Sequence, residues 1–366
     1  MNQKKVYLTA VIFTLAMLLP SYAHASWWNP FSWNYFKNIV DETNIKEKEG
    51  EKDVEPQKNR TIKDDKSAAI RITTRGGIVS WLGQTQEGKY NPVTKKSSPN
   101  VWDIYVYKEG EILKITDSDL NTGGFSAETL YISKDYIYYT VGTGQFKKEK
   151  NLFRYNILTG KTESLLKGEP VSVNGGADDL ILLGFIGKGY SVLDANNNKI
   201  ISLPVSGMYS LSSNENAVCY VNKESVYKYN FNTKQNVLIT QASGLSSPIS
   251  FSCNSEYLAF TSTEPEKETL KIYNIKSGKT ESVHEAVFKP SGMRMGASMV
   301  KIIDDKIYYS LKYDNKFYVQ DLVSKKKKTL STIEKSEQFF DTDGVNFIIG
   351  NTNGQRYITQ ILLRKI

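Results

Sequence analysis

Hydrophobic and polar positions alternate in short runs from residue 68 to the end of the chain. Runs rich in Val, Ile, Tyr and Phe are separated by turns of Gly, Asn, Ser and Lys. No stretch of about ten residues or more has the periodicity of an amphipathic helix. Short apolar runs between tight polar turns are typical of β-strands. The pattern therefore predicts an all-β fold for residues 68–366.

A strand–turn–strand unit recurs along this region. Its copies begin 38, 36, 44 and 47 residues apart. They read YNILTGKTESLL from Tyr155, LDANNNKIISL from Leu193, YNFNTKQNVLI from Tyr229, YNIKSGKTESV from Tyr273 and QDLVSKKKKTL from Gln320. A period of about 40 residues with four strands per repeat is the signature of propeller blades. The sequence therefore predicts a β-propeller.

Division of the region at this period predicts seven blades. They occupy residues 68–117, 118–167, 168–204, 205–242, 243–285, 286–331 and 332–366. The last blade contains only three candidate strands before the chain ends. Because an open blade exposes a row of unpaired backbone groups, a strand from upstream must complete it. We predict that a strand near residues 59–65, within NRTIKDD, closes the last blade.

One segment of the repeat resembles a known family. PISFSCNSEYLAFTS, residues 248–262, is similar to the TolB-type repeat Pro-x-Phe-Ser-Pro-Asp-Gly followed by two residues and Leu-Ala-Phe, with Cys-Asn-Ser in place of Pro-Asp-Gly. The matching positions are Phe251, Ser252, Leu258, Ala259 and Phe260. The resemblance implies a WD40-like propeller of the bacterial periplasm. It also implies a mature N-terminus that signals to partners.

The first 25 residues have the layout of a secretory signal peptide. Lys4 and Lys5 precede an apolar run over residues 6–19, and the small-residue triplet Ala-His-Ala ends at Ala25. This layout predicts cleavage after Ala25 and export to the periplasm, with secretion as the alternative. An uncleaved anchor is disfavoured because the apolar run is shorter than the roughly 20 residues of a membrane span. We expect no transmembrane span in the remainder.

Composition limits the chemistry of the exported chain. The full chain has a formal charge of +8, and residues 1–25 contain two lysines and no acids, which leaves +6. This moderate positive charge favours anionic partners, but the compartment argues against nucleic acid. Only His284 remains after cleavage, and we interpret it as a structural residue at the end of an outer strand. We therefore predict no metal site and no cofactor. Cys219 and Cys253 either form one disulfide or remain two buried thiols.

Two segments separate the signal peptide from the propeller. Residues 26–40 form an aromatic arm, SWWNPFSWNYFKNIV, and residues 41–67 form a linker rich in charges of both signs. The linker has too few apolar groups to fold alone, which predicts a mobile tether. The arm either packs on its own propeller, binds a partner or lies in the membrane interface, since Trp and Tyr suit all three. Its candidate partner-binding residues are Trp27, Trp28, Phe31, Trp33 and Phe36.

Two long connections supply the other candidate binding residues. They span residues 83–100 and 142–150, between the second and third strands of the first two blades, and are rich in lysine. Long loops at one rim of a scaffold are common binding sites. The candidates are Lys89, Tyr90, Lys95, Lys96, Phe146, Lys147 and Lys148, together with Arg294 in SGMRMGASM at the start of an innermost strand. The expected partner is an envelope protein or an anionic envelope polymer.

These features predict a non-catalytic interaction scaffold of the bacterial cell envelope. The sequence contains no phosphate loop, dinucleotide fingerprint or nucleophile elbow. The alternative is a carbohydrate or peptidoglycan hydrolase or lyase that uses carboxylates and tyrosines, since propellers host such sites. Carboxylates that converge at the channel mouth would favour the enzyme. The starts of the innermost strands are small and apolar, which favours the scaffold.

Overall fold

The structure is a computed structural model that describes residues 60–366 except for short internal segments. The segments left out are residues 88–89, 92–95, 98–100, 119–124, 144–149, 170, 178–179, 186–187, 204–207, 212–216, 223–224, 242–249, 265, 288–297, 335–336 and 353–357. The predicted signal peptide, the aromatic arm and residues 41–59 of the linker lie outside the described residues. Within the described part, the regular elements are β-strands, as the sequence predicts.

Five of the described sheets have four antiparallel strands in chain order. The first two are β7 (Phe125–Ile132), β8 (Tyr136–Thr143), β9 (Lys150–Asn156), β10 (Thr162–Glu169), and β11 (Val171–Ala177), β12 (Leu180–Phe185), β13 (Gly189–Asp194), β14 (Lys199–Ser202). The next two are β15 (Met208–Leu211), β16 (Ala217–Asn222), β17 (Ser225–Asn230), β18 (Asn236–Gln241), and β19 (Phe251–Cys253), β20 (Tyr257–Glu264), β21 (Lys267–Asn274), β22 (Lys279–Val287). The fifth is β23 (Met299–Ile303), β24 (Lys306–Ser310), β25 (Lys316–Asp321) and β26 (Lys327–Thr332).

A larger sheet joins the two ends of the described chain. Its strand order is β27-β28-β29-β1-β2-β5-β6. The strands are β27 (Glu337–Thr342), β28 (Asn346–Asn351), β29 (Ile358–Lys365), β1 (Arg60–Arg75), β2 (Ile78–Gln86), β5 (Val101–Lys108) and β6 (Glu111–Lys114). The short strands β3 (Tyr90–Asn91) and β4 (Lys96–Ser97) pair within the connection between β2 and β5.

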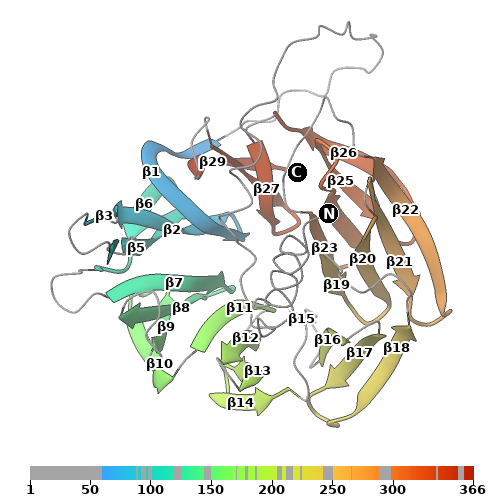
Figure 1. Ribbon diagram of the computed structural model, residues 1–366, viewed down its shortest axis with the longest axis horizontal. Coiled ribbons are helices and arrows are strands. Elements are labelled where there is room, and N and C mark those ends of the chain that lie inside the picture. Colours follow the sequence, from blue (N-terminus) through green and yellow to red (C-terminus); the bar gives the residue numbers. More distant parts are fainter. Residues whose placement is uncertain are drawn as a thin grey trace, which may run out of the picture. The chain divides into compact units, whose positions relative to one another are not determined.

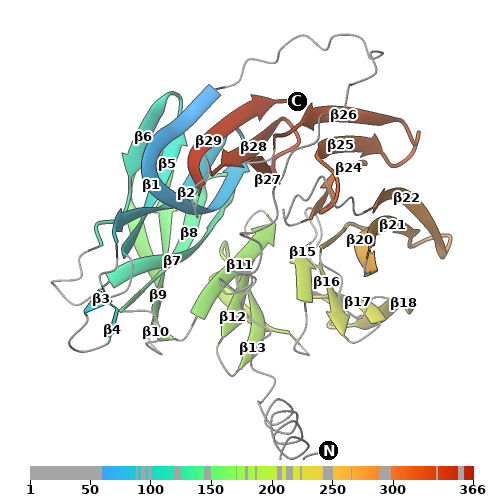
Figure 2. The ribbon, with the colours of Figure 1, turned by 45° about the horizontal axis from the view of Figure 1, so that its top comes forward.

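Strand β1 serves both halves of this sheet. Residues 60–64 pair with β29, where Arg60 lies opposite Leu363, and residues 69–75 pair with β2, while Ala69 also pairs with Ile358 of β29. The register breaks between these two parts, and Figures 1 and 2 both show β1 between β29 and β2. This is the pairing that the sequence predicts for the segment near residues 59–65.

The sheets follow one another around a centre (Figure 1). Strands β1, β7, β11, β15, β19, β23 and β27 contact one another in this order, and β27 contacts β1 again. Apolar clusters fill the space between neighbouring sheets. For example, Ala259 and Ile272 pack with Ile302 and Tyr309 of the next sheet. A central strand such as β20 is covered on both faces, so its first six residues, YLAFTS, are buried and begin with the continuous apolar run YLAF.

The geometry of one turn explains why the repeat is visible in the sequence. The turn between the third and fourth strands begins at Asn156, Asp194, Asn230, Asn274 or Asp321. In all five turns, the side-chain oxygen of this residue accepts backbone N–H groups two or three positions later. The residue four positions later has a φ between 48° and 68°. Glycine favours that conformation, which accounts for TG and SG at two of the turns.

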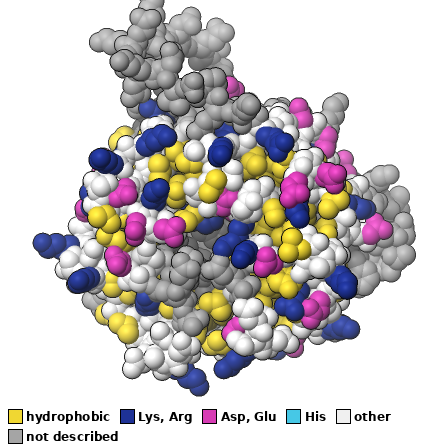
Figure 3. Space-filling view, turned by 180° about the vertical axis from the view of Figure 1, so that it is seen from behind, with side chains coloured by type: hydrophobic (Ala, Val, Ile, Leu, Met, Phe, Trp, Pro, Cys, Tyr) yellow, Lys and Arg dark blue, Asp and Glu magenta, His cyan; other side chains and the backbone are white. Residues whose placement is uncertain are grey.

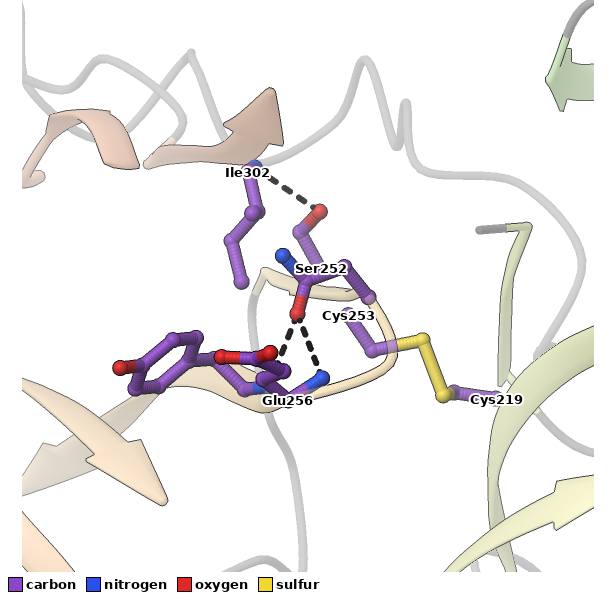
Figure 4. The surroundings of a disulfide bond; sticks show 7 residues. Cys219, Ser252, Cys253, Glu256 and Ile302 are labelled. Carbon is purple, nitrogen blue, oxygen red and sulfur yellow. Dashed lines mark hydrogen bonds between the residues drawn. A yellow bond between two sulfur atoms is a disulfide. The ribbon is translucent and has the colours of Figure 1, made fainter. Parts of the chain in front are cut away.

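Cys219 of β16 and Cys253 of β19 form a disulfide between two neighbouring sheets (Figure 4). Their Cα atoms are 6.4 Å apart and their sequence separation is 34 residues. This settles the alternative that the sequence left open in favour of a bridge. The adjacent Ser252 accepts the backbone N–H of Ile302 at 3.0 Å, so the same short strand also contacts the following sheet.

We predict that reduction of this disulfide destabilises the protein. Loss of a bridge across a loop of this length lowers the free energy of unfolding by about 4 kcal/mol, because the unfolded chain gains freedom. Urea denaturation of residues 26–366 with and without reductant measures the difference. The double variant Cys219→Ala, Cys253→Ala is the control and should not respond to reductant. A wild-type midpoint that reductant leaves unchanged would contradict the prediction.

Candidate functional site

A cavity of about 680 Å³ lies among the innermost strands. Its lining includes the C-terminal ends of β1, β7, β11, β23 and β27 and part of β19. The cavity is therefore surrounded by the turns that lead into the second strands. Its charged side chains are Arg75, Lys134, Lys301, Asp304, Asp341 and Asp343.

Asp341 connects three of the innermost strands. One carboxylate oxygen accepts the Thr73 hydroxyl at 2.7 Å and the Thr74 backbone N–H at 3.1 Å, both from β1. The other oxygen accepts the Lys301 ammonium of β23 at 2.7 Å and the N–H of Thr342 at 2.8 Å. The ammonium also donates to the backbone carbonyl of Thr342. Asp341 thus joins β1, β23 and β27.

Asp343 organises the turn between β27 and β28. One oxygen accepts the backbone N–H groups of Val345 and Asn346 at 2.9 and 2.6 Å. The other accepts the N–H of Gly77, in the turn between β1 and β2, at 3.1 Å. Gly77 has a φ of +79°, which suits glycine. Both aspartates therefore act as acceptors that fix the walls of the cavity.

The other charges of the cavity have mixed sign. Lys134 and Asp304 are exposed and lie in turns between first and second strands, and Arg75 is half-buried at the end of β1. On the face seen in Figure 3, basic and acidic side chains are interspersed with apolar ones. The described part of this face therefore has no field of one sign. The charged side chains that line the cavity are likewise three basic and three acidic, so the cavity has no strong net charge.

The sequence pattern at the starts of the innermost strands does not reveal these carboxylates. The starts are apolar, whereas the aspartates of the cavity lie at the opposite ends. A local signal was present in DTDG at residues 341–344, a pattern typical of a turn. The pattern shows the turn but not the partners of its side chains, which come from β1 and β23.

Most predicted binding residues lie outside the described part of the chain. This holds for Trp27, Trp28, Phe31, Trp33, Phe36, Lys89, Lys95, Phe146, Lys147, Lys148 and Arg294. The backbones of Tyr90 and Lys96 are described, and they lie in the paired strands β3 and β4. The structure thus brings two of the predicted rim residues into one small hairpin.

His284 lies in β22, which is the outer strand of its sheet as predicted, but inside this strand and not at its end. Its Nε2 is 3.2 Å from Asp314, and its Nδ1 faces the Tyr309 hydroxyl and the Lys327 ammonium. A Ser-His-Asp triad requires a serine hydroxyl at that second nitrogen. Among the residues that the structure describes, no group of three or more His, Cys, Asp or Glu side chains is arranged to hold a metal ion.

Comparison with solved structures shows a β-propeller fold. The chain is similar to the β-propeller domain of the Trilobed protease from Pyrococcus furiosus, with 13% identity, a TM-score of 0.52, and coverage of 82% of this chain and 96% of that one. It is also similar to Pyrococcus horikoshii acylaminoacyl peptidase, with 12% identity, a TM-score of 0.54, and coverage of 82% and 52%. A chain of the Mitotic Checkpoint Complex matches with 9% identity, a TM-score of 0.55, and coverage of 90% and 99%.

These likenesses concern the fold alone. The chain spans about half the length of the acylaminoacyl peptidase that it matches. No protein-family model and no curated protein matches the sequence. In the part of the chain that the structure describes, no helix has the length and apolar character needed to cross a membrane.

We predict that Asp341→Ala lowers the free energy of unfolding by about 2 kcal/mol, because it leaves donors of β1 and β23 without their acceptor. Urea denaturation measures the effect. Lys134→Ala, in an exposed turn of the same cavity, is the control and should change stability by less than about 0.5 kcal/mol. Equal effects of the two substitutions would show that Asp341 does not fasten the inner strands.

Proposed function

We propose that this protein is an exported, non-catalytic interaction scaffold built on a seven-bladed, TolB-type propeller. The observation that carries the proposal is the hydrogen bonding of two carboxylates in the cavity. The carboxylates of Asp341 and Asp343 both accept hydrogen bonds from the surrounding strands and turns. A catalytic carboxylate must instead be able to reach a substrate atom. The two aspartates therefore have a structural role in this proposal, and they hold the strands around a polar cavity in place.

The strand pairing supports seven blades. When β1 is counted once with β29 and once with β2, the large sheet divides into two units of four strands. Together with the five separate sheets, these units account for the contacts among the innermost strands. At the TolB-like segment, Asn254 accepts the backbone N–H groups of Glu256 and Tyr257. It thereby forms a tight turn where the family repeat has Pro-Asp-Gly.

The disulfide supports export. Structural disulfides persist in oxidising compartments such as the bacterial periplasm and are rare in the cytosol. Cys219 and Cys253 are bridged within the core between two sheets. This agrees with the signal peptide that we propose for residues 1–25, and with a periplasmic protein.

Partner binding in this proposal uses the aromatic arm and the lysine-rich rim loops. The described chain begins at Arg60, which pairs with Leu363 of β29. A tether of about 20 residues spans roughly 25 Å on average, so an arm at its end has a wide reach. The partner is an envelope protein or an anionic envelope polymer. Packing of the arm on its own propeller and contact with the membrane interface are the competing roles of residues 26–40.

A hydrolase or lyase of carbohydrate or peptidoglycan is the second candidate. It is favoured by one observation, since Asp304, Asp341 and Asp343 line a single cavity. Of these, Asp304 is exposed and is the carboxylate most accessible to a ligand. Turnover of purified envelope polymers by the protein, and its loss in Asp304→Asn, would select this candidate over the scaffold.

We predict that removal of residues 26–40 abolishes capture of the partner and leaves the melting temperature unchanged. Crosslinking of residues 26–366 to envelope extracts, followed by mass spectrometry, identifies and quantifies the captured protein.

We also expect charge reversal in the rim loops to weaken capture of the partner and to reduce the dependence of capture on salt concentration. The lysines to reverse are Lys95, Lys96, Lys147 and Lys148.

The matched control reverses four exposed lysines in or next to the turns between third and fourth strands. They are Lys161, Lys199, Lys276 and Lys279. This variant has the same net charge as the rim variant and should capture the partner normally. A deletion of residues 26–40 that lowers stability by several kcal/mol would show that the arm is part of the core. Capture that both the deletion and the rim variant leave intact would refute the scaffold proposal.

A further inference from the structure

A second group of ionisable side chains lies between two neighbouring sheets. His284 is in β22, the outermost strand of one sheet, and Lys327 is in β26, the outermost strand of the next (Figure 1). Tyr309, Asp314 and Tyr318 belong to the same sheet as Lys327 or to its connection between β24 and β25. We call these five residues the His284 cluster.

The cluster contains a linear relay from carboxylate to imidazole to amine. The Nε2 of His284 is 3.2 Å from Oδ2 of Asp314, and its Nδ1 is 3.0 Å from Nζ of Lys327. With the imidazole neutral and its proton on Nε2, the ring donates to Asp314 and accepts from Lys327. A nucleophile, a base at hydrogen-bond distance and a third group that orients the base are the parts of an activated nucleophile. Here the group in the position of the nucleophile is the side-chain amine of Lys327.

Asp314 is held as the ionised end of the relay. The side chains of His284 and Asp314 are only 14% and 15% exposed. Burial acts against the carboxylate, but hydrogen bonds from His284 and from the Tyr318 hydroxyl outweigh it and keep the pKa of Asp314 below its usual value. A charged Asp314 fixes the imidazole tautomer and leaves Nδ1 free to accept a proton.

The surroundings of Lys327 act on its pKa in both directions, and burial has the largest effect. Burial lowers the pKa of Lys327, the charge of Lys316 adds to this effect, and Asp314 opposes it. The ammonium also lies 4.0 Å from the centre of the Tyr318 ring and 5.6 Å from that of Tyr309, contacts that favour the charged form and fix its position. Burial raises the pKa of both tyrosines, so their hydroxyls stay neutral and do not compete with His284 as bases.

We propose that Lys327 is a nucleophilic amine that condenses with small aldehydes, with His284 as its proton acceptor and Asp314 as the residue that positions His284. The Lys327 ammonium gives a proton to Nδ1 of His284. The free amine then bonds to the carbonyl carbon, and a proton passes from nitrogen to oxygen to give a carbinolamine. His284 returns its proton to the departing hydroxyl group, which leaves as water. The products are a protonated imine on Lys327 and one water molecule.

The neighbouring lysines of the same turn provide an internal comparison. Lys325 forms an ion pair with Glu281 of β22, and Lys328 is exposed, as Lys327 is. Both share the local sequence of Lys327 but not its contact with His284. A difference in reactivity among the three lysines therefore reports on the cluster rather than on the lysine-rich turn.

The test is reductive ethylation of residues 26–366. The folded protein is incubated with acetaldehyde and cyanoborohydride, which reduces each imine to an ethylated amine, and peptide mass spectrometry gives the rate at each lysine. Because Lys327, unlike Lys325 and Lys328, has the base His284 at hydrogen-bond distance, we expect it to react at least about fivefold faster than either of them near neutral pH. We expect His284→Gln to reduce the Lys327 rate toward that of Lys328, with Lys328 unchanged. Asp314→Asn removes the residue that positions His284 but also a charge that raises the pKa of Lys327, so we expect it to cause a smaller reduction.

Each result decides the matter. A Lys327 rate no greater than that of Lys328 in the wild-type protein would overturn the proposal. So would a fast Lys327 rate that both variants retain, because the reactivity would then not depend on the relay. An unfolded variant is recognised by its near-ultraviolet circular dichroism and by equal rates at all three lysines. In that case, the other variant and the wild-type ratio decide.

Discussion

The fold depends on the pairing of one strand with two partners. Residues 60–64 of β1 add to β29 at the end of the chain, and residues 69–75 add to β2 near its start. Without the first pairing, β29 would present an open row of backbone groups to solvent. Because the same strand continues into the other half of the sheet, the ends of the described chain are held together without a separate interface.

Two sets of polar contacts fasten this junction. Lys63 is only 5% exposed, and its ammonium donates to the carbonyls of Ser67 and Thr359 and to the Asp65 carboxylate. These bonds hold the bend where β1 passes from one partner to the other. A buried ammonium is stable only when its donors are satisfied, as they are here. Asp341 performs the same task at the inner end of β1, so the cavity walls and the closure of the ring depend on the same strand.

The parts of the fold that the sequence predicted are those specified by residues close together in the chain. The repeated turns are legible because each begins with Asn or Asp and requires a residue of positive φ four positions later, as at Asn156 and Gly160. The closing strand was predictable from the three strands of the last repeat. Contacts across the ring have no such signal. Asp341 and Thr73 are 268 residues apart, and the pairing of Cys219 with Cys253 depends on which sheets are neighbours. The partners of His284 could not be predicted for the same reason, because they belong to the next sheet. The aromatic arm and most of the rim residues lie outside the described part of the chain.

The effect of a proline in the outer half of β1 tests the closure most directly. Thr61 lies opposite Leu362 of β29, and proline within a paired strand distorts or removes ladder hydrogen bonds. The account predicts that Thr61→Pro lowers the urea midpoint of residues 26–366 and accelerates amide exchange in β29, whereas Val54→Pro in the linker does neither. Unchanged stability and exchange in Thr61→Pro would contradict it, because β1 would then not hold the ends of the propeller together.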